Sequence, residues 1–323
     1  MMMKRRCRTA LFLPASNARA MEKVRHLACD TVILDQEDAV APEAKAAARD
    51  AAVAAAHQGF GDRRLVVRAN AAGTVWHDED LAALAGAPVD AVLLPKLDDA
   101  GSCDAARQAL GKNGPALWAM IETARGLMAL PALAAGASTW RLEALVAGTN
   151  DLALDLRCRP DAARTPLVPH LAAIVAAARA GGMIALDGVL NAIKDEARLA
   201  AECAQGAMLG FDGKTLIHPG QIAAAQAAFG PTDAELAWAA RVIAAFAAPE
   251  ADGRGAIALD GAMVERLHLA EAERLLADCE PLSMDRSELP FRAPADAGAQ
   301  GGANRKMLFC VALGSCFRRS AAG

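Results

Sequence analysis

Short apolar runs alternate with helical stretches along most of this 323-residue chain. The run at residues 31–35 is β-branched and ends in an acid, and the alanine-rich stretch at residues 42–56 opens with a proline, as helices often do. Runs that are apolar throughout suit the strands of a parallel sheet that helices cover on both sides. The alternation therefore predicts an α/β fold.

The alternation occurs eight times in roughly 220 residues, which is the size of a (β/α)8 barrel. The predicted strands cover residues 9–13, 31–35, 64–68, 90–96, 117–122, 143–148, 183–187 and 208–217. The predicted helices cover residues 17–27, 42–56, 78–84, 98–110, a stretch that begins after residue 122, 172–180, 196–204 and 219–228. An open doubly wound sheet is the alternative, but no G-x-G-x-x-G follows the first strand. We therefore expect a (β/α)8 TIM barrel.

Composition divides the chain into four parts. A basic leader at residues 1–7 precedes the barrel, which we expect to cover residues 8–230. An appendage follows at residues 231–280, with a helix at 233–248, a strand at 255–260 and a helix at 261–277. From residue 281 to residue 323 the sequence turns to Pro, Gly, Ala and scattered charge, which predicts a disordered tail.

Charge and cysteine usage exclude several classes of protein. The net charge of −4 is spread without long like-charged blocks, so no nucleic-acid or membrane surface is indicated. No apolar run reaches the roughly 20 residues that a membrane helix needs. The eight cysteines include no C-x-x-C pair and no secretory signal opens the chain, which favours reduced thiols in the cytoplasm.

Polar residues follow the predicted strands where each strand ends, and in a barrel these ends form one ring. Glu122 ends the fifth apolar run, and Asp151 follows the sixth. Converging carboxylates repel one another, and a hard cation such as Mg²⁺ relieves that repulsion. Arg68, at the end of the third run, can pair with a substrate carboxylate or a developing oxyanion. The sequence therefore predicts a Mg²⁺ site that accepts a small oxo acid.

The ring residues also have purely structural explanations. An acid after a strand is most often a helix cap or a solvated loop residue, and Asp38 and Asp187 fit that description. Arg68 can be a structural partner for a nearby acid, and Lys96 can fill the barrel rim. The two acids after the fifth and sixth runs are harder to explain in this way.

Seven ordered motifs resemble one known family. They are LFLP at residues 11–14, LDQEDAV at 34–40, VRAN at 67–70, LPK at 94–96, IETARG at 121–126, GTNDL at 148–152 and GFDGKTLIHP at 210–219. Together they resemble the citrate lyase β-subunit and malyl-CoA lyase group of the HpcH/HpaI aldolase superfamily. The resemblance extends from about residue 8 to residue 277, and the number of ordered motifs makes it specific at the level of the family.

The resemblance implies a barrel of the phosphoenolpyruvate/pyruvate type that assembles as homotrimers or homohexamers. It implies that Glu122 and Asp151 bind Mg²⁺, that Arg68 and Glu122 contact the substrate, and that Glu37 and Asp38 order water around the metal. Members of this group cleave or form a carbon–carbon bond between an acyl thioester and a 2-oxo acid. We therefore expect a Mg²⁺-dependent lyase that acts on a CoA thioester such as malyl-CoA, citramalyl-CoA or a citryl thioester.

Three positions depart from the family pattern. Ala15 stands where the family commonly has glycine. Gln36 replaces a residue that is usually apolar, and Glu265 stands where many relatives have an aspartate that is proposed to carry the proton. In the family the appendage completes the site of an adjacent subunit. We therefore expect Glu265 of one subunit to serve the Mg²⁺ site of another, while a solvated helix acid is the plain alternative.

Three other functions remain open from the sequence. An aldolase that acts on a free 4-hydroxy-2-oxo acid would use the same metal without a thioester. A malyl-CoA thioesterase would let water attack the same thioester. A non-catalytic barrel would keep the fold and bind ligands without turning them over. The presence of Arg68, Glu122 and Asp151 together argues against this third function.

Overall fold

The computed structural model describes residues 7–248, 251 and 253–277. The chain divides after Gly230 into two compact units, which are treated separately below. The predicted basic leader at residues 1–7 lies outside the described residues except for Cys7, and the predicted disordered tail at residues 281–323 lies wholly outside them. No helix in the described part of the chain is long and apolar enough to cross a membrane.

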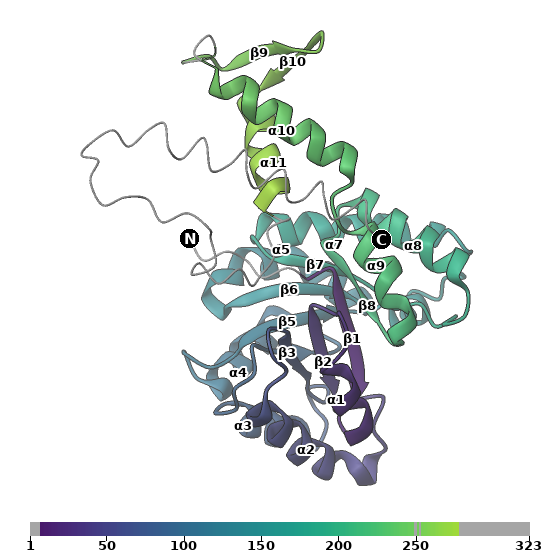
Figure 1. Ribbon diagram of the computed structural model, residues 1–323. Helices are drawn as coiled ribbons and strands as arrows, with labels where there is room; N and C mark the ends of the chain where they lie inside the picture. Colours follow the sequence, from purple (N-terminus) through teal and green to yellow (C-terminus); the bar gives the residue numbers. More distant parts are fainter. Residues whose placement is uncertain (1–6, 249–250, 252, 278–323) are drawn as a thin grey trace, which may run out of the picture. The chain divides into compact units, whose positions relative to one another are not determined.

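The first unit is a closed barrel of eight parallel strands in which each strand pairs with the next and β8 pairs with β1. The strands are β1 (Thr9–Pro14), β2 (Thr31–Asp35), β3 (Arg64–Arg68), β4 (Ala91–Leu94), β5 (Ala116–Ile121), β6 (Leu142–Ala147), β7 (Ile184–Asp187) and β8 (Gly213–Leu216). Figure 1 shows these strands at the centre of the unit. The predicted (β/α)8 barrel is confirmed.

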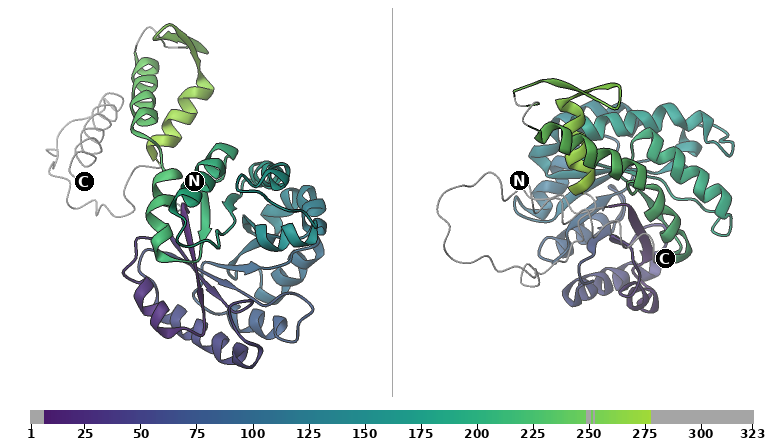
Figure 2. Two further views of the ribbon diagram at one scale, coloured as in Figure 1. Left: turned by 90° about the vertical axis from the view of Figure 1, so that its right-hand side faces the viewer. Right: turned by 45° about the horizontal axis from the view of Figure 1, so that its top comes forward.

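Helices surround the barrel, and the two further views in Figure 2 show them outside the strands. They are α1 (Ala18–Val24), α2 (Lys45–Gln58), α3 (His77–Leu84), α4 (Ala100–Leu110), α5 (Ala124–Trp140), α6 (Thr149–Asp155), α7 (Val168–Ala180), α8 (Glu196–Leu209) and α9 (Ile222–Ala228). Several begin at side-chain caps. Thr123, for example, accepts a hydrogen bond from the backbone N–H of Gly126 at 2.9 Å, so α5 starts directly after Glu122.

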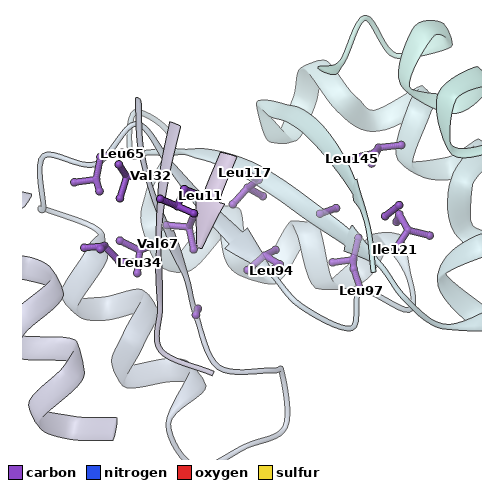
Figure 3. Packing of buried hydrophobic residues seen from close by; sticks show 14 of the residues in the cluster. Leu11, Val32, Leu34, Leu65, Val67, Leu94, Leu97, Leu117, Ile121 and Leu145 are labelled. Atoms are coloured by element: carbon purple, nitrogen blue, oxygen red, sulfur yellow. The ribbon is translucent and has the colours of Figure 1, made fainter. Parts of the chain in front are cut away.

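Successive strand residues face opposite sides of the barrel wall, because side chains alternate along a strand. Ile33 and Val66 belong to a buried cluster built almost wholly from strand residues, which is the barrel interior. Val32, Leu34 and Val67 belong to the larger cluster that includes the helices, and Figure 3 shows part of its packing. The same alternation directs Asp35 and Arg68 to the interior.

The eighth strand is shorter than the sequence suggested. We expected a strand over residues 208–217, but α8 continues to Leu209 and β8 covers only Gly213–Leu216. Gly210 ends the helix with a φ of 95°, a conformation that favours glycine. The apolar residues just before Gly210 were therefore misread as strand.

The second unit contains α10 (Asp233–Ala247), the antiparallel pair β9 (Ala256–Leu259) and β10 (Ala262–Glu265), and α11 (Arg266–Ala277). The sequence-based helix over residues 261–277 is wrong in its first part. Asp260 and Gly261 both have positive φ, at 53° and 81°, and join β9 to β10 as a two-residue hairpin. Asp-Gly is a strong signal for such a turn, and the apolar residues around it belong to strands.

Candidate active site

Arg68 is anchored by Asp35 at the C-terminal ends of two neighbouring strands. Asp35 of β2 pairs in register with Arg68 of β3. Nε and Nη2 of Arg68 each donate to one oxygen of the Asp35 carboxylate at 2.7 Å. Burial alone would lower the pKa of Arg68, but the hydrogen bonds and charge of Asp35 outweigh it and raise that pKa. Arg68 is therefore a fixed cation inside the barrel rim.

Glu37 lies between two cations. Its Oε2 is 3.0 Å from Nη1 of Arg68, and its Oε1 accepts a hydrogen bond from Nζ of Lys96 at 2.6 Å. Burial raises the pKa of Glu37, and the charge of Arg68 opposes that shift without cancelling it. Asp38 differs, because its side chain is 59% exposed and its Oδ2 is 3.4 Å from Nη1 of Arg68. Of the two acids, Glu37 is therefore the one that lies closer to Arg68 and Lys96 and is shielded from solvent.

Glu122 is buried at the end of β5, with 2% of its surface exposed. Its Oε1 accepts a hydrogen bond from the backbone N–H of Lys96 at 2.6 Å. Burial raises the pKa of Glu122 to about 7, although the N–H of Lys96 acts in the opposite direction. A Cβ at Gly148 would lie 2.6 Å from Oε2 of Glu122, so only glycine leaves room for this carboxylate.

This burial predicts that the metal-free protein loses stability as pH rises. Glu122 stays protonated in the folded protein up to about pH 7, whereas its ordinary pKa is 4.5. Between these values the folded state binds more protons than the unfolded state, so the free energy of unfolding should fall by on the order of 3 kcal/mol. Urea denaturation in EDTA across this range tests the sign. Glu122→Gln keeps an acceptor for Lys96 and should remove this part of the slope; an identical slope in the variant would refute the assignment.

Asp151 lies in the first turn of α6, directly beyond β6, which pairs with β5. Asp151 and Glu122 thus come from the ends of neighbouring strands. No group of three or more His, Cys, Asp or Glu residues in the described part of the chain gathers as a metal site. Mg²⁺ commonly uses only one or two carboxylates and keeps water in its other positions. The two acids therefore offer the type and number of donors that Mg²⁺ commonly uses.

Sequence reasoning allowed Arg68 to pair with a nearby acid and placed Lys96 at the barrel rim, but it did not identify the contacts of Asp35 or of Lys96. Lys96 joins the two buried acids, since its ammonium bonds Glu37 and its backbone N–H bonds Glu122. It has a φ of 48°, a left-handed conformation that is uncommon for residues other than glycine. The LPK motif gave the position of Lys96 at a strand end but not this conformation. Glu265 belongs to the second unit, where its backbone N–H donates to Nδ1 of His268 at 3.0 Å.

A second buried ionic cluster lies on the outer side of the barrel wall. Nζ of Lys214 is 3.1 Å from Asp187 and 3.2 Å from Glu202 of α8, and Arg164 is 2.7 Å from Asp187. The expectation that Asp187 is a helix cap or a solvated acid is wrong, because it is fully buried. Burial would raise the pKa of Asp187, but Lys214 and Arg164 outweigh it and lower that pKa.

Gln36 is buried with no hydrogen-bond partner for either side-chain amide atom among the described residues. An unsatisfied buried polar group costs about 1–3 kcal/mol. We therefore expect Gln36→Leu to raise the free energy of unfolding by about 1 kcal/mol, since leucine has a similar size and no polar atoms. Thermal unfolding of the two proteins measures the change. A lower Tm for Gln36→Leu would contradict it.

The sequence pattern of the HpcH/HpaI aldolase/citrate lyase family matches residues 8–219, which carry the whole strand-end cluster. The chain belongs to this family. A (3S)-malyl-CoA thioesterase of Cereibacter sphaeroides is 44% identical over 283 residues, which cover 87% of this chain and 97% of that protein. A citrate lyase subunit beta-like protein of Mycobacterium tuberculosis is 37% identical, covering 82% of this chain and 93% of that protein.

One solved structure has a similar fold. It is CitE from Mycobacterium tuberculosis in complex with magnesium, acetoacetate and coenzyme A. Its sequence is 35% identical, the similarity covers 84% of this chain and 97% of that chain, and the TM-score is 0.68. The resemblance drawn from the seven motifs is confirmed.

The expected reaction needs correction. We expected a carbon–carbon lyase from the motifs, with thioester hydrolysis as an alternative. The 44% identical relatives from Cereibacter sphaeroides are named (3S)-malyl-CoA thioesterase, and they match this chain over nearly their full length. This finding overturns the lyase expectation and favours the alternative. The motifs could not separate the two reactions, because both start from the same thioester.

Proposed function

We propose that this protein hydrolyses the thioester of a malyl-CoA-like substrate to the free hydroxy acid and coenzyme A. The observation that carries the proposal is the 44% identity to (3S)-malyl-CoA thioesterase over 97% of that relative. The site supports it with Glu37, a buried acid that lies between Arg68 and Lys96 and whose pKa is raised by burial.

In this proposal Glu122 and Asp151 hold Mg²⁺. The carboxylate donors are the type that Mg²⁺ prefers. The relative CitE was solved with magnesium, acetoacetate and coenzyme A, which supports a divalent ion and a thioester ligand for this chain. When bound, Mg²⁺ would polarise an oxygen of the substrate.

The protein's own groups supply the proton transfer. Glu37 would take a proton from a water molecule while the oxygen of that water bonds to the thioester carbonyl carbon. The carbon–sulfur bond then breaks, and the sulfur leaves as the thiol after it receives a proton from Glu37. Nη1 of Arg68 and Nζ of Lys96, which both face Glu37, would offset negative charge at this position.

One assay separates hydrolysis from carbon–carbon cleavage. Purified protein with Mg²⁺ and (3S)-malyl-CoA should release free thiol with no 2-oxo acid and no acetyl-CoA. Free thiol and oxo acid are measured in parallel, and a sample in EDTA serves as the control. Equal amounts of oxo acid and acetyl-CoA, without free thiol, would refute the proposed hydrolysis.

We also propose that the protein is a homo-oligomer in which Glu265 of one subunit serves the site of another. Mixing inactive Arg68→Ala chains with inactive Glu265→Gln chains should restore part of the activity, because a mixed oligomer pairs an intact barrel with an intact second unit. Activity is measured after subunit exchange has been confirmed by mass. Full activity of Glu265→Gln alone would exclude this role, and an inactive mixture would place Glu265 and Arg68 in the same subunit's site.

A further inference from the structure

Lys45 is a buried lysine whose ammonium donates hydrogen bonds only to neutral oxygens and lies 5.0 Å from the centre of the Trp76 ring. It lies at the start of α2 and is 6% exposed. Its Nζ donates to the carbonyls of Gln36 and Glu37 at 3.0 and 2.9 Å and to Oδ1 of Asn70 at 2.6 Å. An ammonium has three N–H donors, so all three are used. Among the described residues, no acid forms an ion pair with Lys45.

The Asn70 contact is itself held in place. The backbone N–H and the side-chain amide of Asn70 both donate to Oδ2 of Asp80, at 2.9 and 2.6 Å. The other oxygen of Asp80 accepts from Nε of Arg49 at 2.7 Å. Lys45 and Arg49 are four residues apart on α2 and so lie on one face of the helix. The amide of Asn70 therefore presents its oxygen to Lys45 in a fixed direction.

A buried cation is an expensive way to stabilise a fold. Removing an ammonium from water costs several kcal/mol, and an apolar side chain of similar volume often stabilises as well or better. What Lys45 provides that an apolar residue cannot is a pair of hydrogen bonds to two consecutive carbonyls. These carbonyls precede and follow the Cα of Glu37, so φ and ψ of Glu37 cannot change without loss of a bond to Lys45.

We propose that Lys45 is a positioning residue that fixes the backbone of Glu37 and so aims its carboxylate at Arg68 and Lys96. The inference rests on the proposed function, in which Glu37 accepts the proton of the attacking water. Asn70 and Asp80 complete the assembly by orienting the third acceptor of Lys45. Lys45 itself touches neither the reacting atoms nor the Mg²⁺ ligands Glu122 and Asp151.

Lys45→Met tests this role by separating kcat from KM. The variant keeps most of the side-chain volume but cannot bond the two carbonyls, so kcat should fall on the order of 10²-fold, as misplacement by about 1 Å can cause. KM and the Mg²⁺ dissociation constant should stay unchanged, because the residues proposed to bind substrate and metal are intact. Lys112→Met is the matched control, since Lys112 is exposed before β5, at the opposite end of the barrel.

Two further measurements decide the remaining outcomes. Asn70→Ser replaces the amide that accepts from Lys45 with a shorter hydroxyl side chain, and it should lower kcat less than Lys45→Met does. A crystal structure of Lys45→Met should show that the 2.6 Å contact between Glu37 and Lys96 is lost, whether or not the protein hydrolyses malyl-CoA. Inactivity of the wild type would therefore refute the proposed function but not the positioning. Unchanged kcat in a folded Lys45→Met, or failure of both variants to fold, would overturn the inference.

Discussion

Replacing Lys214 with methionine should lower the free energy of unfolding by about 3–5 kcal/mol, because removal of one partner strands a buried opposite charge. Lys214 is fully buried and bonds both Asp187 and Glu202. Without it, Asp187 keeps only Arg164 as a cationic partner, and Glu202 keeps Arg164 at 4.0 Å and the half-exposed Arg198 at 3.2 Å.

Urea denaturation followed by circular dichroism measures this effect. Lys112→Met provides the control, because an exposed lysine should change stability by no more than about 0.5 kcal/mol. A Lys214→Met protein as stable as the wild type would mean that Asp187 and Glu202 become protonated or hydrated at little cost. It would refute the claim that Lys214 stabilises the fold.

Replacing Glu37 with glutamine should lower kcat by about 10²–10⁴-fold, the usual contribution of a general base. Glutamine keeps the size of the side chain but cannot accept the proton of water. Stability should not fall in parallel, because the pKa of Glu37 is raised and its burial as a charge is unfavourable. Initial rates of thiol release from malyl-CoA measure the loss.

The neighbouring acid supplies the comparison. Asp38→Asn removes a carboxylate only one residue away, but its side chain is 59% exposed. It should therefore lose less activity than Glu37→Gln. Equal losses in the two variants would assign proton transfer to both acids, and a larger loss in Asp38→Asn would reverse the proposed roles.

The fold followed from the sequence because each barrel unit has a local signal. A short apolar run, a polar end and a capped helix recur, and Glu122 and Asp151 are found at strand ends for that reason. The Asp260–Gly261 turn was missed although its signal is local, because its flanking residues were assigned to one strand and one helix. Local patterns therefore gave the barrel and failed where two readings of an apolar run competed.

The contacts within the candidate site were harder to predict from the sequence than the fold was. Arg68 was expected to grip a substrate, yet two of its nitrogens bond Asp35. Lys45 carried no signal at all, because a lysine near the start of a helix is usually solvated. Such contacts depend on how the loops after β2, β3 and β4 meet, and spacing along the chain does not encode those distances.

The barrel wall separates two ionic clusters that share no residue. Arg68 and its acids face the interior, whereas Lys214 and its acids lie between the strands and α8. Substitutions in separate clusters should have nearly additive effects on stability. Mutational change can therefore reshape substrate choice on the inner side while the outer cluster keeps its contribution to the fold. A laboratory selection for a new thioester has most freedom when its library spares the outer cluster and varies only the inner rim.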